Sequence, residues 1–509
     1  MKQAAGFLFP YIRHMGKPPE AASSFKPSSQ FSLILRVRIV DRPGMLGKLT
    51  SVIGKAGGSL GTIALVSTND QTLVRDIVVN AASEAQAGKV LKAIRRLSFA
   101  EVVSVLDQTF LLHRGGKIEV QPTRPIHTCE ELSMIYTPGV GRVSTAIHER
   151  PEAVWDYTIK GNTVAVVTDG SAVLGLGNLG PEAALPVMEG KAVLFKAFAG
   201  INAFPICLKT QDTGEIVETV ERIAPAFGGV NLEDISAPRC FEIERELRKR
   251  LEIPVMHDDQ HGTAVVVLAG LLNALRLVGK RLASVRIVVS GAGAAAVGVS
   301  RLLAKAGAGD IIVCDRGGAI YEGRGERMNP AKEWLAQWTN PGRLKGTIGA
   351  ALKGADVFLG LSAPGSVTPE ALKRMARNSV VFAMANPTPE VMPEQVPFAR
   401  VVATGRSDYP NQINNALAFP GVFKGAMEAR SRRITNEMLI AAAKAIAEAV
   451  PPASLGPRSI IPSIFDEAVC PAVARAVAEA AGGPRLSRVN GHRASAVAAG
   501  GALSGARLS

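Results

Sequence analysis

Two pairs of acidic residues lie beside short apolar stretches of this chain. Glu233 and Asp234 follow the run that ends at Leu232, and Asp258 and Asp259 stand directly before a long apolar segment. Burying a carboxylate alone is costly, but carboxylates that share a divalent cation are tolerated. Ligation by oxygen alone favours Mg²⁺ or Mn²⁺. The pattern therefore predicts a metal site, with helix capping by Asp258 or Asp259 as the alternative interpretation.

Two histidines near these acids raise the question of zinc. His257 and His261 stand four positions apart. A zinc site normally adds further histidine or cysteine ligands, and no cysteine lies nearby. The carboxylate interpretation is therefore preferred.

A lysine and a tyrosine are candidates for proton transfer. Lys191 lies within the apolar run Val187–Lys196, where a lysine either extends its ammonium to solvent or has a lowered pKa and acts as a base. Lys196, in the same run, is the better candidate for the solvent-reaching role. Tyr136 lies in the turn IYTPGV, which presents a phenol, although an isolated tyrosine more often serves packing.

A glycine-rich turn predicts dinucleotide binding. In VRIVVSGAGAAAVGVSRLLAKAG a strand leads into G-x-G-x-x-A and then into a helix. The first glycine permits a tight turn, the second lets the backbone approach a pyrophosphate, and the alanine allows close packing of helix on strand. A plain glycine turn is the alternative. The residues concerned are Gly291, Ala292, Gly293, Ala294, Ala295 and Ala296.

Asp315 strengthens this interpretation, because it ends the next expected strand at about the usual 20-residue distance. Its carboxylate suits the ribose hydroxyls of NAD and repels the 2′-phosphate of NADP. Its neighbour Arg316 could instead receive that phosphate. The sequence thus favours NAD while leaving NADP possible.

The elements around these residues predict an α/β fold. Residues 115–258 mix helices and short strands and carry most of the charged motifs. Residues 259–481 alternate buried strands with helices, which is typical of a doubly wound, Rossmann-type parallel sheet. The expected strands are Val285–Val289, Ile311–Cys314, Val357–Leu361, Val380–Ala383 and Val401–Ala403.

Residues 32–113 predict a separate βαββαβ unit of the ferredoxin-like type. Alternating Leu33, Leu35, Val37 and Ile39 indicate a half-buried strand. A helix capped by Asp41 and ended by Gly57–Gly58 should follow. Further strands are expected at Leu60–Ser67, Thr72–Asn80 and Val102–Leu111, with a helix at about Glu84–Leu97.

Composition excludes several classes of protein. The net charge is +14, but the arginines are scattered and no basic block with interleaved aromatics appears, so no nucleic-acid partner is expected. Apolar runs are broken well short of a membrane span. The five dispersed cysteines form no C-x-x-C pair, which indicates a reducing, cytoplasmic location. Residues 1–31 should form a flexible arm and 482–509 a disordered tail.

The N-terminal unit resembles the ACT domain, on the segment DRPGMLGKLTSVIGKAGGSLGTIALV. That resemblance implies a regulatory module that binds an amino acid or another small metabolite and pairs with its own copy. A unit that only dimerises is the alternative. The ligand should bind at the turn formed by Asp41, Gly44 and Leu46, where the N–H groups at a helix start can receive a carboxylate.

From about Ile118 to Ala481 the chain resembles the malic enzymes, of the compact bacterial type. The resemblance rests on YTPGV, TDGSAVLGLGNLGPEAALPVMEGKA, NLED, HDDQHGTA, the glycine loop, ANPTPE and NNALAFPG. It implies oxidative decarboxylation of (S)-malate to pyruvate and CO₂, with reduction of NAD or NADP, a divalent metal and a homo-oligomer. Alternatives are a malolactic or oxaloacetate-decarboxylating variant, and an amino-acid-sensing protein on a catalytically dead scaffold.

The resemblance also implies roles for individual residues. Tyr136 becomes the general acid and Lys191 the general base, which also binds substrate. Asn415 contacts the substrate, and Asn386 lies near the nicotinamide. One departure is Ala172, which stands where many larger malic enzymes have a substrate-binding arginine. The metal ligands implied are Glu233, Asp234 and Asp259.

Overall fold

The computed structural model describes residues 28–482, so the predicted arm and tail lie almost entirely outside the described residues. By internal packing the chain divides at Gly115–Gly116 into two compact units. Each unit is described by itself.

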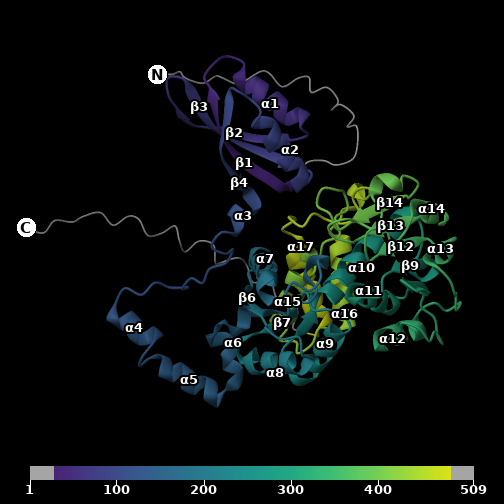
Figure 1. The fold of residues 1–509 in the computed structure, drawn as a ribbon. Helices are drawn as coiled ribbons and strands as arrows, with labels where there is room; N and C mark the ends of the chain where they lie inside the picture. The colour runs from purple at the N-terminus through teal and green to yellow at the C-terminus, as the bar shows by residue number, and fades with distance from the viewer. Residues whose placement is uncertain (1–27, 483–509) are drawn as a thin grey trace, which may run out of the picture. The chain divides into compact units, whose positions relative to one another are not determined.

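The N-terminal unit is an antiparallel sheet covered by two helices (Figure 1). The sheet order is β2-β3-β1-β4, and the βαββαβ order predicted from the sequence is confirmed. Alternate residues of β1, Leu33, Leu35, Val37 and Ile39, are buried with apolar side chains of α1 and α2. The elements are β1 (Ser28–Val40), α1 (Met45–Lys55), β2 (Ser59–Thr68), β3 (Thr72–Ala81), α2 (Glu84–Ile94), β4 (Ala100–Asp107) and α3 (Gln108–His113).

Two details of this unit differ from the sequence-based expectation. Asp41 does not cap α1: the helix begins after Gly44, whose φ of 84° is a left-handed conformation that glycine adopts without strain. The strand expected to reach Leu111 ends at Asp107. There the Asp107 carboxylate accepts from the backbone N–H groups of Thr109 and Phe110 and starts α3, so local capping ends the strand.

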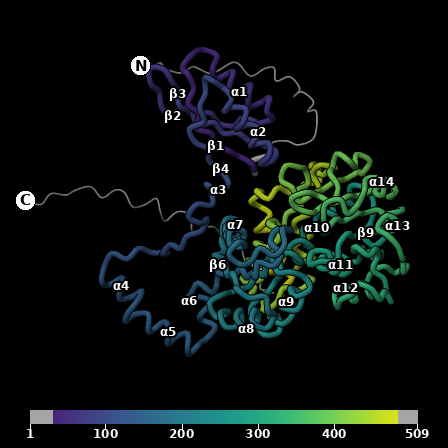
Figure 2. Tube along the Cα trace, in the orientation of Figure 1, coloured from purple at the N-terminus to yellow at the C-terminus, as the bar shows by residue number. Residues whose placement is uncertain are grey.

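The larger unit begins with two helices, α4 (Cys129–Ile135) and α5 (Val140–Glu149), neither of which buries a residue. Figure 2 shows their trace running outside the rest of this unit. A parallel sheet of order β6-β5-β7-β8 follows. Its elements are α6 (Val154–Tyr157), β5 (Thr163–Thr168), α7 (Pro181–Ala199), β6 (Asn202–Cys207), α8 (Thr213–Ile223), β7 (Gly229–Leu232), α9 (Arg239–Arg250) and β8 (Val255–His257).

Helix α10 (Asp258–Val278) leads from this sheet to the next one. It is long and apolar enough to cross a membrane by length and composition, but most of it is buried, as in the core helix of a folded domain. Its apolar side chains share one core with both neighbouring sheets. This packing fixes the first turn of α10 against the ends of β7 and β8.

The second sheet confirms the predicted doubly wound arrangement. Its order is β11-β10-β9-β12-β13-β14, parallel except for the short strand β11. Its strands are β9 (Arg286–Ser290), β10 (Asp310–Asp315), β11 (Gly318–Ala319), β12 (Val357–Gly360), β13 (Val380–Ala383) and β14 (Val401–Thr404). Its helices are α11 (Ala294–Lys305), α12 (Pro330–Trp338), α13 (Ile348–Ala351), α14 (Pro369–Leu372), α15 (Phe419–Glu428), α16 (Asn436–Glu448) and α17 (Val469–Ala480).

Candidate metal and dinucleotide site

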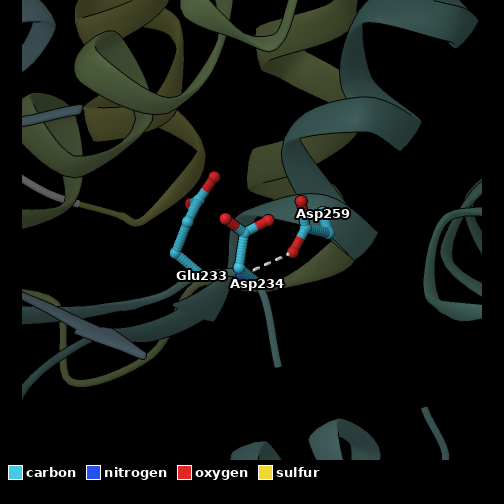
Figure 3. A group of neighbouring side chains, drawn as sticks. All are labelled: Glu233, Asp234 and Asp259. Carbon is cyan, nitrogen blue, oxygen red and sulfur yellow. Dashed lines mark hydrogen bonds between the residues drawn. The ribbon is translucent and has the colours of Figure 1, made fainter. Parts of the chain in front are cut away.

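Three carboxylates meet where β7 and β8 end (Figure 3). Glu233 and Asp234 follow β7, and Asp259 lies in the first turn of α10, directly after β8. Each offers one oxygen, and these oxygens all lie within 4.8 Å of one another. The backbone N–H of Asp234 donates to Asp259 Oδ2 at 2.9 Å. Three of the four acids that the sequence pattern pointed to therefore lie together, because neighbouring parallel strands end at one edge of a sheet.

The negative charge of these carboxylates exceeds the positive charge of the groups around them. Burial and the charges of Asp259 and Glu233 raise the pKa of Asp234 to about 8. Burial also raises the pKa of Glu233 to about 7, against the opposing effect of Lys191. The Oδ2 atom of Asp234 is buried without a hydrogen-bond partner, and its backbone has the unusual φ of 53°. Crowded, buried carboxylate oxygens of this kind fit a hard divalent cation.

Lys191, on α7, is buried beside the cluster with 6% of its surface exposed. Its Nζ lies 2.6 Å from Asp258 Oδ2 and 2.9 Å from Glu233 Oε1. Burial by itself lowers the pKa of Lys191, but the carboxylates of Asp258 and Glu233 outweigh it and raise the pKa above its ordinary value. The expectation of a lowered pKa is therefore wrong for this arrangement. The solvent-reaching alternative is wrong for Lys191 as well, whereas Lys196 is exposed, as predicted, and donates to Asn202 at 2.8 Å.

Asp258, which the sequence pattern included among the candidate acids without a separate role, is the hydrogen-bond partner of Lys191. Its Oδ2 accepts hydrogen bonds from Lys191 and from Asn415, at the start of the short helix after β14. A Cβ at Gly262 would lie only 1.8 Å from Asp258 Oδ1, so glycine at this position makes room for the carboxylate. Neither Asp258 nor Asp259 caps α10, whose N-cap, His257, makes no side-chain cap bond. The signal available in the sequence was the doubled acid in HDDQHG.

The two histidines lie beside the acids rather than in the cluster. His257 Nε2 is 3.4 Å from Asp259 Oδ2, and His261 pairs with Glu244 of α9 at 2.9 Å. Across residues 28–482, the one group of potential ligands close enough to share an ion consists of the three carboxylates. The geometry thus favours oxygen ligation over zinc.

Tyr136 is not brought to this site within one chain. It is the C-cap residue of α4, its surface is 67% exposed, and the structure records no contact between it and Lys191. The neighbouring side chains Leu132, Met134 and Ile135 are exposed too. The assignment of Tyr136 as general acid therefore stays a prediction.

The glycine loop has the geometry that the motif predicts. Gly291 has φ 112°, and a Cβ there would come within 2.3 Å of the Leu361 carbonyl oxygen. A Cβ at Gly293, the N-cap of α11, would meet nothing within 4 Å, so the backbone is open to an approaching phosphate. Ala296 is fully buried where α11 packs. These residues fit a dinucleotide pyrophosphate at a helix N-terminus.

Asp315 ends β10 but is not a free carboxylate. Its Oδ1 accepts from Arg324 at 2.8 Å, and its Oδ2 accepts from Lys332 at 2.7 Å. Burial alone raises the pKa of Asp315, but these two cations outweigh it and lower the pKa. Arg316 is exposed. The simple argument that Asp315 repels a 2′-phosphate is therefore incomplete, because sequence spacing did not reveal the two cations beside it.

Two further predicted positions lie near these elements. Asn386 is exposed after β13, and a Cβ at Gly175 would lie 3.2 Å from its carbonyl oxygen. Ala172 is half-buried, and its N–H donates to the Asp234 carbonyl at 2.9 Å. Its methyl side chain has no charge to offer a substrate carboxylate.

Fold and site together define a class: an oxidoreductase-type α/β protein with a dinucleotide loop and a buried lysine–carboxylate centre. Comparison with family models gives the particular family. The malic enzyme N-terminal domain matches residues 115–248, the malic enzyme NAD-binding domain matches 260–482, and the ACT domain matches 33–99. The chain belongs to the malic enzyme family and carries an N-terminal ACT domain.

Individual relatives agree with this assignment. The chain is 55% identical over 435 residues to an NAD-dependent malic enzyme of Geobacillus stearothermophilus, covering 85% of this chain and 91% of the relative. It is 53% identical over 391 residues to a bifunctional malic/malolactic enzyme of Bacillus subtilis, covering 76% and 95%. The crystal structure of an NAD-dependent malic enzyme from Thermotoga maritima superposes with a TM-score of 0.71 at 49% identity, covering 73% and 99%.

Proposed function

We propose that this chain oxidises (S)-malate with NAD and decarboxylates the product to pyruvate and CO₂. The observation that carries the proposal is the buried Lys191 held between Asp258 and Glu233 beside the three-carboxylate cluster. Membership of the malic enzyme family supports the same reaction. The NAD preference is supported by the two NAD-dependent relatives, and NADP remains the second candidate oxidant.

The chain's own groups suit the proton transfers of this reaction. Lys191 must first give up a proton, and Asp258, whose pKa burial raises to about 7, lies within hydrogen-bond reach to take it. Neutral Lys191 then accepts the proton of the malate C2 hydroxyl. Asn415, which donates to Asp258, is placed to orient the substrate. The burial of this centre keeps water away from the transferred proton.

Two bound groups complete the chemistry. Glu233, Asp234 and Asp259 would hold Mg²⁺ or Mn²⁺, which would supply Lewis-acid polarisation, and the glycine loop would hold NAD, the oxidant for the C2 hydride. When the bond between C3 and the C4 carboxylate breaks, its electron pair stays on C3 and CO₂ leaves. Tyr136 is our candidate for the group that protonates C3. The product is pyruvate.

The direct experiment incubates the protein with malate, NAD and Mn²⁺ and measures NADH, pyruvate and lactate. We expect NADH and pyruvate to accumulate in equal amounts. Lactate without net NADH would instead favour the malolactic alternative, which the Bacillus subtilis relative makes relevant. No turnover with any of these products would favour the dead-scaffold alternative, although the complete set of Lys191, Asp258 and acidic ligands argues against it.

We further propose that a homo-oligomer completes the site. Helices α4 and α5 bury no residue and leave Met134, Tyr136 and Val140 exposed, which an isolated chain in water would rarely maintain. A second copy that covers this surface could receive Tyr136 into its own Lys191 centre. The partner copy would then contribute the general acid.

Mixing two inactive variants tests this assembly. If Tyr136 acts across copies, Y136F chains unfolded and refolded together with K191A chains form hybrids that hold one intact site and regain activity. If Tyr136 acts within its own chain, every site in the hybrid lacks one group and activity stays absent. Light scattering of the wild type gives the oligomer size.

The ACT unit is proposed to bind a small carboxylate, such as an amino acid. Asp41, Gly44 and Leu46 line a cavity of about 290 Å³, as the sequence suggested for its ligand turn. Arg75 lines it too, and its Nε is buried without a hydrogen-bond partner. A carboxylate would satisfy that donor. The ligand can alter catalysis only if it favours one conformational state over another.

Two measurements test this role. Thermal-shift titration with the common amino acids should find one that stabilises the wild type but not R75Q. A chain shortened to begin near His113 should keep malate oxidation but lose that ligand's effect. Complete inactivity of a folded shortened chain would show that the ACT unit belongs to the catalytic machinery.

We also propose a cytoplasmic location. The five cysteines all lie in the described part of the chain, and none is in a disulfide. Free thiols suit a reducing compartment.

A further inference from the structure

One cavity of the larger unit lies outside the proposed active site. It has a volume of about 860 Å³ and is lined by side chains of α9, α11 and α12, with His261 and Arg433. None of the three clustered carboxylates, the glycine loop or Asp315 lines it. Its size suits a metabolite rather than a single ion. We name it the basic pocket.

The basic pocket is lined by more cations than acids. Two acids, Glu242 and Glu244, line it against six cations. Four cations are already engaged by acids: Arg239 pairs with Asp169, Arg248 with Glu244, Arg245 with Glu242 and Glu246, and Lys249 with Glu246. Arg301 and Arg433 have no ion pair among residues 28–482, so the pocket attracts anions. The cations are Arg239, Arg245, Arg248, Lys249, Arg301 and Arg433.

Arg301, on α11, is the cation whose surroundings point most clearly to a ligand. It is half-buried, and its guanidinium carbon lies 4.7 Å from the centre of the Trp334 ring and 5.9 Å from that of Phe241. Within residues 28–482 no ion pair or hydrogen bond to an acid is recorded for it. Both aromatic rings lie within cation–π distance of the guanidinium, and they do not neutralise its charge. A planar fork of donors without an acid partner is suited to phosphate oxygens.

Glu244, which lines the basic pocket, is connected to the carboxylate cluster through a single residue, His257. Glu244 accepts from the backbone N–H of His257 at 3.2 Å and pairs with His261 at 2.9 Å. His257 Nε2 in turn lies 3.4 Å from Asp259 Oδ2. An anion that binds Arg248 or His261 in place of Glu244 therefore changes the contacts of Glu244 with His257. His257 in turn lies beside Asp259, a proposed metal ligand.

We propose that the basic pocket binds a small metabolite that carries phosphate groups, at a site separate from substrate and dinucleotide. Three features favour phosphate groups. Arg301 and Arg433 have no ion pair among residues 28–482 and together suit a polyvalent anion, the cavity is larger than a four-carbon acid needs, and the planar Arg301 guanidinium suits a bidentate contact. The site is independent of whether malate is the substrate.

The test titrates the full-length, metal-free protein with inorganic pyrophosphate by calorimetry. Saturating NAD is present, so that the glycine loop is occupied, and no malate is added. We expect saturable binding to the wild type and at least about tenfold weaker binding to R301Q, because a hydrogen-bonded charge contributes roughly that much. R301K keeps the charge but loses the planar fork and should be intermediate. Lys305, exposed one turn along α11 and absent from the pocket, supplies the matched control K305Q.

Each outcome bears on the proposal. Binding that K305Q weakens as much as R301Q does reflects general positive charge and overturns it. Succinate binding as tightly as pyrophosphate, with the same dependence on Arg301, overturns the phosphate assignment. Absence of pyrophosphate binding at millimolar concentration also overturns it. Thermal melting checks that each variant is folded, and R245Q replaces R301Q if the latter does not fold. Because no catalysis is measured, failure of this test leaves the proposed reaction unaffected.

Discussion

The Lys191 ammonium lies 2.6 Å from Asp258 Oδ2, in a pair with both side chains buried. The two residues are 67 positions apart and come from α7 and from the first turn of α10. A buried pair of this kind is strongly destabilised when one partner is removed. The same contact gives Lys191 an immediate proton acceptor, so structure and chemistry depend on it together.

Substitutions at Lys191 and Lys196 compare the roles of the buried and the exposed lysine of α7. K191A should lower kcat by about 10²-fold or more, because it removes the proposed general base. K196A should stay near wild-type activity, since Lys196 only donates to Asn202. Steady-state malate oxidation is the measurement. Equal losses in both variants would point to a general disturbance of α7.

Gly262 should prove intolerant of even one added carbon. A Cβ there would lie 1.8 Å from Asp258 Oδ1 and 3.3 Å from Asn415 Cβ. We expect G262A to destabilise the fold by about 1–3 kcal/mol and to lose most activity. G54A, at an exposed position of α1 with nothing within 4 Å, is the control for a glycine-to-alanine change in a helix. An unchanged melting temperature and kcat in G262A would show that Asp258 moves without consequence.

Removal of the divalent metal should abolish activity and lower the melting temperature. A ligand that binds only the folded state stabilises it in proportion to the logarithm of its concentration over Kd. After chelation, added Mn²⁺ should restore both properties in the wild type. D259N should need a far higher Mn²⁺ concentration for both. Full activity of the chelated wild type would contradict the metal site.

The stability of the protein should depend on pH through Glu244. Burial raises the pKa of Glu244, but His261, Arg248 and His257 outweigh it and lower the pKa to about 2 from 4.5. Because the folded pKa is depressed, the stabilisation is present above about pH 4.5 and is lost as the pH falls towards 2. It amounts to about 3 kcal/mol at most. The melting temperatures of wild type and E244Q should therefore differ most above pH 5 and converge in acid; a constant difference would contradict this origin.

The preference for NAD or NADP should depend on the ion pairs that Asp315 forms with Arg324 and Lys332. D315S frees Arg324 and Lys332, which can then meet a 2′-phosphate. We expect the ratio of kcat/KM for NADP over that for NAD to rise by about tenfold or more. R316Q is the matched variant, because Arg316 was the cation suggested by sequence alone. A larger change in R316Q than in D315S would make Arg316 the determinant.

Local patterns were sufficient for much of the molecule. Alternation in Leu33–Ile39 identified the buried face of β1, and the glycine loop with its flanking strand and helix located the start of α11. Acids beside apolar stretches predicted a metal site, and the family resemblance reduced the four candidates to Glu233, Asp234 and Asp259, which the structure brings together. Such signals are local: they depend on backbone conformation, burial periodicity and the common edge at which parallel strands end.

Contacts between distant segments required the tertiary structure. Only the tertiary structure shows that Asp258, in the first turn of α10, contacts Lys191 of α7, and that the pKa of Lys191 is raised rather than lowered. The cations beside Asp315 come from a later loop and helix, and the basic pocket gathers side chains from several helices. Tyr136 is a further example: its motif identifies the residue, but the sequence does not show which surface its side chain contacts. Electrostatic environment depends on distance in space, which residue spacing along the chain does not determine.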